Sequence, residues 1–121
     1  MPVKRVLIVD DSPTERYFLT EVLRKQGYEV IMAENGEQGV AVAKQERPDL
    51  ILMDVVMPGL NGFQATRQLS RNAETQAIPV ILCTTKGQET DRVWGMRQGA
   101  IDYLVKPVVA DDLLAKVKAL G

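Results

Sequence analysis

The sequence predicts an α/β fold in which one open parallel sheet is covered by helices on both faces. Short runs that are apolar throughout alternate with longer segments in which apolar residues recur at helical spacing. Continuous apolar runs are typical of strands buried on both faces, and their alternation with helices is typical of parallel sheets. We expect strands near residues 4–9, 29–33, 49–53, 79–83 and 101–105. A helical pattern follows each run, so the chain is predicted to contain five strand–helix units.

The first helix has the clearest predicted boundaries. Ser12 is suited to cap its N-terminus, Pro13 suits the first helical position, and Glu15 lies three residues beyond the cap. We therefore expect the helix to begin at Pro13 and to end before Gly27, a residue common just past a helix C-terminus. Its expected apolar stripe consists of Phe18, Leu19, Val22 and Leu23.

The second and third helices also begin at recognisable signals. The second is expected to follow Asn35-Gly36 and to stop before Pro48, which cannot continue a helix. The third is expected to begin near Gly62. The residues expected to face the sheet are Val40 and Ala43 on the second helix, and Phe63, Thr66 and Leu69 on the third.

The last two helices are predicted mainly from the spacing of their apolar residues. The fourth is expected over about 88–98, ending at Gly99, and the fifth is expected to follow Asp111. The inward residues expected on the fifth helix are Leu114, Val117 and Leu120.

Composition and charge indicate one soluble domain. The 121 residues are 45% hydrophobic, which is enough for one core and leaves little for a second. Fifteen basic and sixteen acidic residues, without a dense basic run, give no electrostatic signature of nucleic-acid binding. No apolar stretch approaches the roughly 20 residues of a membrane span, and no signal-peptide segment follows Met1. We expect a single cytoplasmic domain over residues 1–121, without membrane insertion.

Histidine and cysteine usage narrows the chemistry. The chain has no histidine, which removes the commonest general base and the usual zinc ligand. Its single cysteine, Cys83, lies inside an apolar run, so we expect a buried packing thiol and no internal disulfide.

Polar residues follow four of the predicted strands. Asp10 and Asp11 follow the first strand, Asp54 the third, Thr84 the fourth and Lys106 the fifth. In an open parallel sheet the carboxyl ends of the strands meet at one edge, so these side chains are expected to lie together. Three carboxylates, a hydroxyl and an ammonium group could hold a divalent cation and offer one carboxylate for attack on phosphorus. Because the donors are all oxygens, the metal is expected to be Mg²⁺ or Mn²⁺.

Each of these residues also has a simpler interpretation. Asp10 and Asp11 could cap the first helix, although the following serine already suits that role. Asp54 by itself could be a loop carboxylate, and Lys106 a solvated lysine. Thr84 could be an ordinary strand residue, since β-branched residues are common in strands. Their joint occurrence at strand ends favours the functional interpretation.

The same positions carry a resemblance to a known family. The chain resembles, from end to end, the receiver domain of two-component response regulators. The matching motifs are Asp10-Asp11, Asp54, Met57-Pro58-Gly59 with Asn61-Gly62, Thr84 and Lys106-Pro107. The resemblance implies a flavodoxin-like (βα)5 fold with strand order 2-1-3-4-5, and a phosphoryl group transferred from a kinase histidine to Asp54.

The resemblance also implies a set of metal ligands. Asp11 and Asp54 would bind Mg²⁺ or Mn²⁺ directly, the main-chain carbonyl of Val56 would add a ligand, and Asp10 would act largely through water. The positive end of the helix that starts at Pro13 would face the same cluster.

The remaining roles implied by the resemblance concern the phosphoryl group. Lys106 would hold one of its oxygens, and the Thr84 hydroxyl would move to follow it. Tyr103 would then act as a rotameric switch, with a purely packing tyrosine as the alternative. Val56 and Lys86 would lie beside the water that hydrolyses the acyl phosphate.

Within that family, the segments 58–68 and 78–86 are most similar to stand-alone regulators of type IV pilus twitching motility. A flagellar chemotaxis-type regulator is the alternative. The partners then expected are a sensor histidine kinase or phosphotransfer domain and a downstream motility protein, with the domain acting as a monomer, either as an output or as a phosphate sink.

Two enzyme or carrier classes fit less well. A phosphohydrolase that uses an aspartate nucleophile would carry an Asp-x-Asp motif in place of the adjacent Asp10-Asp11 pair. A flavodoxin-like electron carrier would have a Ser/Thr-rich phosphate loop after the first strand, and this chain has none. We therefore expect a signalling module without an external turnover substrate.

Overall fold

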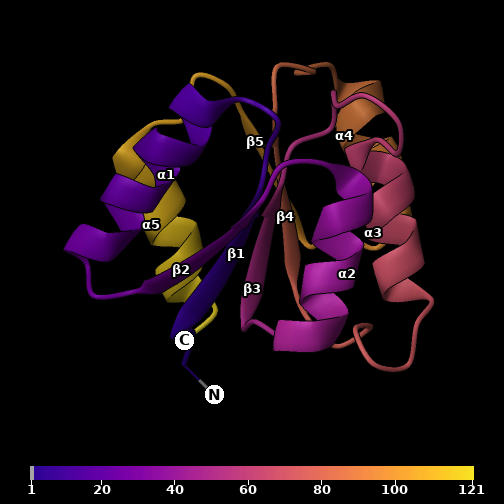
Figure 1. Cartoon of the computed structure of the whole chain (residues 1–121). Helices are drawn as coiled ribbons and strands as arrows, with labels where there is room; N and C mark the ends of the chain where they lie inside the picture. Colours follow the sequence, from indigo (N-terminus) through magenta and orange to yellow (C-terminus); the bar gives the residue numbers. More distant parts are fainter. Residues whose placement is uncertain (1) are drawn as a thin grey trace.

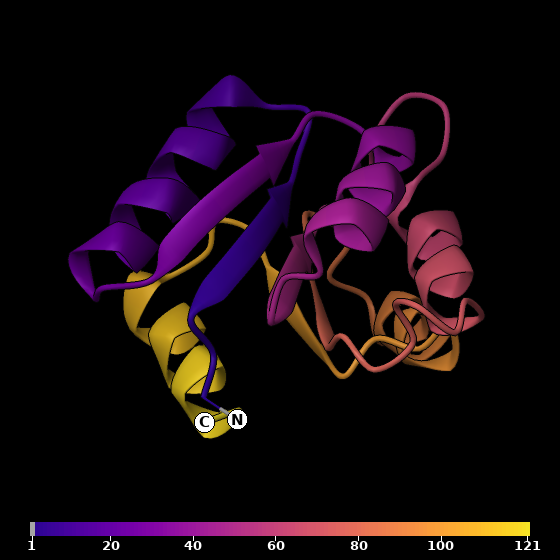
Figure 2. The ribbon, with the colours of Figure 1, turned by 60° about the horizontal axis from the view of Figure 1, so that its bottom comes forward.

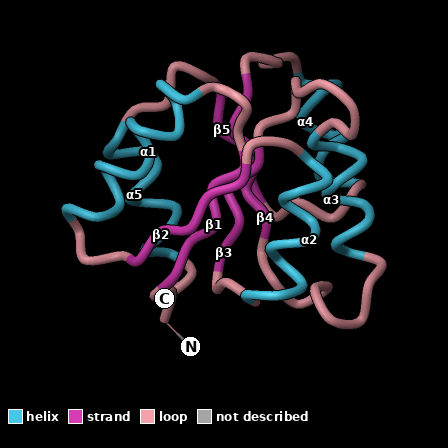
Figure 3. Tube along the Cα trace, viewed as in Figure 1, coloured by secondary structure: helices cyan, strands magenta, loops and turns pink. Residues whose placement is uncertain are grey.

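The computed structural model describes residues 2–121 and confirms the predicted α/β fold. Five strands form one parallel sheet in the order β2-β1-β3-β4-β5, as expected (Figure 1). The strands are β1 (Arg5–Val9), β2 (Glu29–Ala33), β3 (Leu50–Met53), β4 (Val80–Thr84) and β5 (Asp102–Val105). Because every strand runs in the same direction, the loops that follow the strands gather at one edge of the sheet (Figure 3).

Helices cover both faces of the sheet. They are α1 (Pro13–Lys25), α2 (Gly36–Glu46), α3 (Gly62–Ser70), α4 (Glu89–Arg97) and α5 (Ala110–Ala119). Helices α1 and α5 lie on one face, and α2, α3 and α4 lie on the other (Figures 1 and 2). Among the described residues, no helix is both long enough and apolar enough to cross a membrane.

The core is divided into two layers by the sheet. Along β1, Leu7 and Val9 pack with the residues of α2 and α3, whereas Val6 and Ile8 pack with those of α1 and α5. Adjacent side chains of a strand point to opposite faces, so a strand covered on both sides is apolar at every position. This is the physical reason for the continuous apolar runs in the sequence. Cys83 belongs to the layer between the sheet and helices α1 and α5. Burial raises the pKa of its thiol to about 12.

The start of α1 agrees with the prediction, but its cap is only half of a capping box. The Ser12 hydroxyl accepts a hydrogen bond from the Glu15 N–H at 3.2 Å. The N–H of Ser12 donates to Asp10 Oδ1 at 2.9 Å, so it is not bound by the Glu15 side chain. One carboxylate oxygen of Glu15 is consequently buried without a hydrogen-bond partner. Gly27 follows the helix with φ of 89°, as expected for a residue just past a C-terminus.

Two details of the predicted core are wrong. Phe18 is 38% exposed, because α1 turns Leu19 and Leu23 toward the sheet. Helix α5 begins at Ala110 rather than after Asp111. Its fully buried residues are Val117, as expected, and Leu113, which was not predicted to face inward. Leu114 and Leu120 are only partly buried and pack against the edge of the layer formed with α1 and α5.

Candidate functional site

The carboxylates of the site are positioned by the continuation of sheet pairing beyond the strands. The Asp54 N–H donates to the Val9 carbonyl at 2.9 Å, and the Asp10 N–H donates to the Ala33 carbonyl at 3.2 Å. Asp10 and Asp54 therefore lie next to each other where β1 and β3 end. Asp10 is 1% exposed and Asp54 is 6% exposed, whereas Asp11 is open to solvent.

The three aspartates form one cluster, as the sequence predicted. Asp10, Asp11 and Asp54 can each offer a carboxylate oxygen such that these oxygens lie within 4.8 Å of one another. All of the donors are carboxylate oxygens, which are ligands that Mg²⁺ and Mn²⁺ prefer. The residues present therefore fit a hard divalent cation, and the exposed Asp11 leaves the cluster accessible from solvent.

Lys106 reaches this cluster from the end of β5. Its N–H donates to the Thr84 carbonyl at 2.8 Å, which continues the β4–β5 pairing. Its ammonium lies 2.8 Å from Asp10 Oδ2 and 3.5 Å from Asp54 Oδ2. The Lys106 side chain is only 14% exposed, so these interactions are poorly screened by water. The ammonium is thus more tightly paired with Asp10 than with Asp54.

The electrostatics show a site with an excess of negative charge. Burial raises the pKa of Asp54 to about 6, and repulsion by Asp10 acts in the same direction while Lys106 opposes both. Burial lowers the pKa of Lys106, but its hydrogen bond to Asp10 and the charges of Asp54 and Asp10 outweigh this and leave it raised. A cation among the carboxylates would relieve the repulsion that raises the pKa of Asp54.

Asp10 is more constrained than the sequence could indicate. One of its carboxylate oxygens accepts from the Ser12 N–H, and the other accepts from Lys106. Its main-chain carbonyl accepts from the Arg16 guanidinium at 2.6 Å, and Arg16 in turn pairs with Glu34 at 3.6 Å. Sequence reasoning missed Arg16, because an arginine one turn into a helix carries no local signal for a contact with the loop before that helix.

Thr84 and Tyr103 converge on the main chain of a residue that we did not expect to join them. Thr84 is the last residue of β4, rather than the first residue after it, and is completely buried. Its hydroxyl accepts from the Lys86 N–H at 3.2 Å, and the Tyr103 hydroxyl donates to the Lys86 carbonyl. Tyr103 is itself only 7% exposed, and burial raises its pKa to about 12. The peptide units around Lys86 therefore connect the two residues.

The other predicted site residues lie close by in the chain. Val56 is two residues beyond Asp54, and its side chain is 54% exposed. Asp54 Oδ1 accepts from the N–H of the intervening Val55 at 2.8 Å. The peptide bond between Lys106 and Pro107 is cis.

Comparison with known proteins agrees with this geometry. A family model for the response regulator receiver domain matches residues 6–118. The chain belongs to the response regulator receiver domain family. The matched region contains the three aspartates, the threonine and the lysine of the site.

Relatives of this receiver domain include proteins of similar length and longer proteins. It is 66% identical to protein PilH of Pseudomonas aeruginosa, over 96% of both chains. It is 41% identical to the phosphate regulon transcriptional regulatory protein PhoB of the same species, over 97% of this chain. The chain spans only 51% of that regulator's length.

Solved structures share the fold over nearly the whole receiver domain. The chemotaxis protein CheY4 of Vibrio cholerae has a TM-score of 0.91 and 31% identity, covering 98% of this chain and 99% of that one. The receiver domain of a sensor histidine kinase from Pseudomonas aeruginosa has a TM-score of 0.89 and 31% identity. The match covers 98% of this chain and 97% of that one. That structure has a magnesium ion coordinated in its active-site cleft.

Proposed function

We propose that this receiver domain is a stand-alone response regulator whose Asp54 accepts a phosphoryl group from a histidine of a sensor kinase or phosphotransfer domain. The observation that carries the proposal is the position of Asp54, which clusters with the Asp10 and Asp11 carboxylates and lies 3.5 Å from the Lys106 ammonium at the carboxyl edge of the sheet. An acceptor needs a nucleophilic oxygen with cationic groups around the transferred phosphoryl group, and this edge supplies both.

The transfer is a displacement at phosphorus. An oxygen of the Asp54 carboxylate attacks the phosphorus of the donor phosphohistidine, so that a P–O bond forms as the P–N bond breaks. The imidazole takes up one proton as it leaves. Lys106 already lies 3.5 Å from Asp54 Oδ2, where its ammonium can contact an oxygen of the incoming group. No histidine is needed on this chain, because catalysis consists of positioning and charge neutralisation.

Asp11, Asp54 and the main-chain carbonyl of Val56 would hold Mg²⁺ or Mn²⁺. The cation would supply positive charge that offsets the carboxylates and the phosphoryl oxygens. Asp10 has both side-chain oxygens engaged by Ser12 and Lys106, which supports a role for it through water.

The phosphoryl group would be sensed through Thr84. In this proposal its hydroxyl would donate to a phosphoryl oxygen, whereas in the structure it accepts a hydrogen bond from the Lys86 N–H. A change at Thr84 would therefore alter the Lys86 main chain, whose carbonyl accepts from Tyr103. This chain of contacts would convert a local electrostatic event into a change of the surface near α4 and β5.

Control of type IV pilus twitching motility is the cellular role that we favour, supported by 66% identity to PilH over nearly the full length of both proteins. In this role the domain would bind a downstream motility protein, or it would act as a phosphate sink that accepts phosphoryl groups from a shared kinase. A flagellar chemotaxis-type regulator is the second candidate, supported by the likeness to chemotaxis protein CheY4.

Intact-mass analysis after incubation with a small phosphodonor and Mg²⁺ tests the proposed chemistry. The wild-type protein should gain one phosphoryl mass, and removal of divalent metal by a chelator should prevent it. Asp54→Asn should abolish the gain, whereas Asp11→Asn should reduce it and be partly rescued by excess Mg²⁺. Undiminished labelling of Asp54→Asn would refute the assignment, and turnover of a phosphatase substrate would favour a phosphohydrolase.

A further inference from the structure

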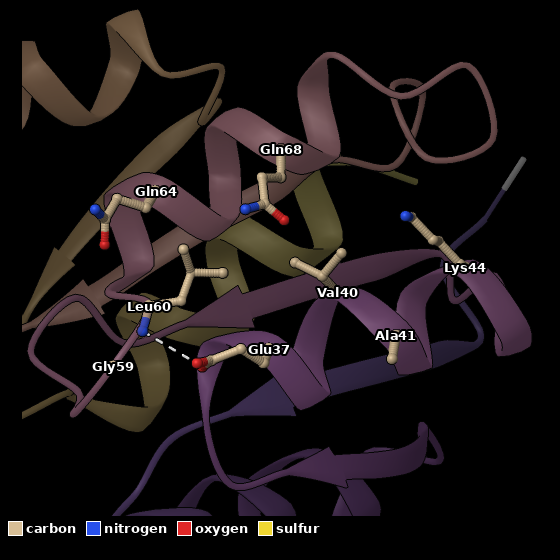
Figure 4. Close-up of a pocket in the computed structure, with 8 residues that line it drawn as sticks. All are labelled: Glu37, Val40, Ala41, Lys44, Gly59, Leu60, Gln64 and Gln68. Carbon is tan, nitrogen blue, oxygen red and sulfur yellow. Dashed lines mark hydrogen bonds between the residues drawn. The ribbon is translucent and has the colours of Figure 1, made fainter.

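Helix α2 contacts the loop that follows the phosphoryl acceptor. An open groove of about 600 Å³ lies between α2 and α3, and Glu37 and Leu60 meet at one end of it (Figure 4). Glu37 is in the first turn of α2, and its carboxylate accepts a hydrogen bond from the Leu60 N–H at 3.3 Å. The two residues are 23 positions apart in the chain, so this contact joins separate elements.

The fit between α2 and this loop depends on two glycines. A Cβ at Gly36 would overlap the Leu60 carbonyl oxygen and lie 3.1 Å from the carbonyl carbon. Gly59 has φ of 72°, and a Cβ there would lie 2.8 Å from a Glu37 carboxylate oxygen. At Gly36 the N-terminus of α2 and the loop are therefore held at a separation that only hydrogen in place of Cβ allows, whereas at Gly59 the positive φ is what favours glycine.

The loop is also held at its other end. The Gly62 N–H donates to the Val55 carbonyl at 2.9 Å, and Asn61 and Gln64 form a complete capping box at the start of α3. Segment 55–61 is thus attached to β3, to α3 and, through Glu37, to α2. Val56, whose carbonyl is a proposed metal ligand, lies inside this segment.

We propose that Glu37 is a positioning residue for the metal site, because its hydrogen bond to Leu60 holds the segment that carries the Val56 carbonyl. This inference rests on the proposed function, in which that carbonyl binds Mg²⁺. Metal ligands generally depend on outer contacts that orient them, and loss of such contacts lowers metal affinity. Glu37 acts on a main-chain ligand through the loop and does not touch the metal itself.

Isothermal titration calorimetry with Mg²⁺ provides the test. Glu37→Ala removes the acceptor and should raise the Kd for Mg²⁺ about fivefold, equivalent to about 1 kcal/mol. Glu37→Gln keeps an acceptor oxygen without the charge, so its Kd should stay within about twofold of wild type. Lys44→Ala alters the same groove two turns further along α2 and should leave the Kd unchanged.

Two further measurements separate positioning from loss of stability. Hydrogen exchange of the Leu60 amide should be faster in Glu37→Ala than in Glu37→Gln, while the rate of phosphorylation at saturating Mg²⁺ should return to the wild-type value in both. Equal Mg²⁺ affinity in wild type and Glu37→Ala would overturn the inference. Equal losses in Glu37→Ala and Glu37→Gln would also overturn it, since charge alone would then be responsible. Wild-type protein that fails to bind Mg²⁺ would instead refute the proposed function.

Discussion

Gly62 is the residue through which helix α3 touches the main chain of Asp54, the proposed phosphoryl acceptor. It is buried at the first position of α3. A Cβ at this position would overlap the Asp54 carbonyl oxygen and lie 2.8 Å from both the Asp54 carbonyl carbon and the Val55 Cα. These are backbone atoms and cannot rotate away. Gly62→Ala therefore has to move either α3 or the backbone that bears the Asp54 carboxylate.

The size of the effect follows from two opposing terms. Overpacking of a well-packed site costs about 1–3 kcal/mol, while replacing glycine by alanine in a helix returns at most about 1 kcal/mol, and less in the first turn. We expect a net loss of about 2 kcal/mol. With an unfolding entropy of about 2.1 cal/mol/K per residue over the 121 residues, Tm should fall by about 8 °C.

Displacement of Asp54 should also slow the chemistry. A shift of about 1 Å in a reacting group can cost about 10²-fold in rate, so we expect phosphorylation by a small donor to slow by at least about tenfold. Thermal unfolding followed by circular dichroism gives Tm, and intact mass against time gives the phosphorylation rate. The phosphorylation rate is measured at a temperature where the variant remains folded.

Gly27→Ala is the matched control for this experiment. Gly27 has φ of 89° and open space around its missing Cβ, so alanine there is strained without touching the site. That strain costs about 1–2 kcal/mol, which lowers Tm by a similar amount to Gly62→Ala. The control should nevertheless keep the wild-type phosphorylation rate. If Gly62→Ala leaves both Tm and the rate unchanged, the contact with the Asp54 backbone is not limiting and the reasoning is wrong.

Three other outcomes are expected. Thr84→Ala should still accept the phosphoryl group but lose most of the phosphorylation-dependent change in partner binding, measured by titration of the partner. If phosphorylation changes partner binding as much in the variant as in wild type, Thr84 is not part of the switch. Val56→Asn should shorten the lifetime of the phosphorylated form by about tenfold once donor is removed, because an amide can orient the attacking water where valine cannot; an unchanged decay of the phosphoryl mass would exclude this role. Asp102→Asn should reduce the free energy of unfolding at pH 7 by up to about 1 kcal/mol, by removing the 2.9 Å pair with Lys116. Burial raises the pKa of Asp102, but Lys116 and a main-chain donor outweigh burial and leave the pKa lowered. The stability difference between wild type and Asp102→Asn should therefore be present above the unfolded pKa of about 3.9 and vanish as pH falls through the folded pKa. A stability difference that persists at pH 2 in denaturant titrations would contradict this prediction.

The sequence alone was sufficient for the sheet and for bringing the charged residues at the strand ends into one cluster. Strands covered on both faces must be apolar at every position, and this one-dimensional pattern located all five strands within one residue of their observed bounds. Parallel strands bring their carboxyl ends to one edge, so residues that follow strands, such as Asp10, Asp54 and Lys106, could be placed together without knowledge of any contact.

Only the tertiary structure decided which groups touch and how tightly. Lys106 pairs more closely with Asp10 than with Asp54, and the Lys86 main chain joins Thr84 to Tyr103. Neither relation has a periodic signature, because both depend on rotamers and on loops brought together from different elements. The burial of Leu113 rather than Leu114 on α5 has the same origin. Helical spacing allows either leucine to face inward, and the packing of the helix against the twisted sheet selects between them.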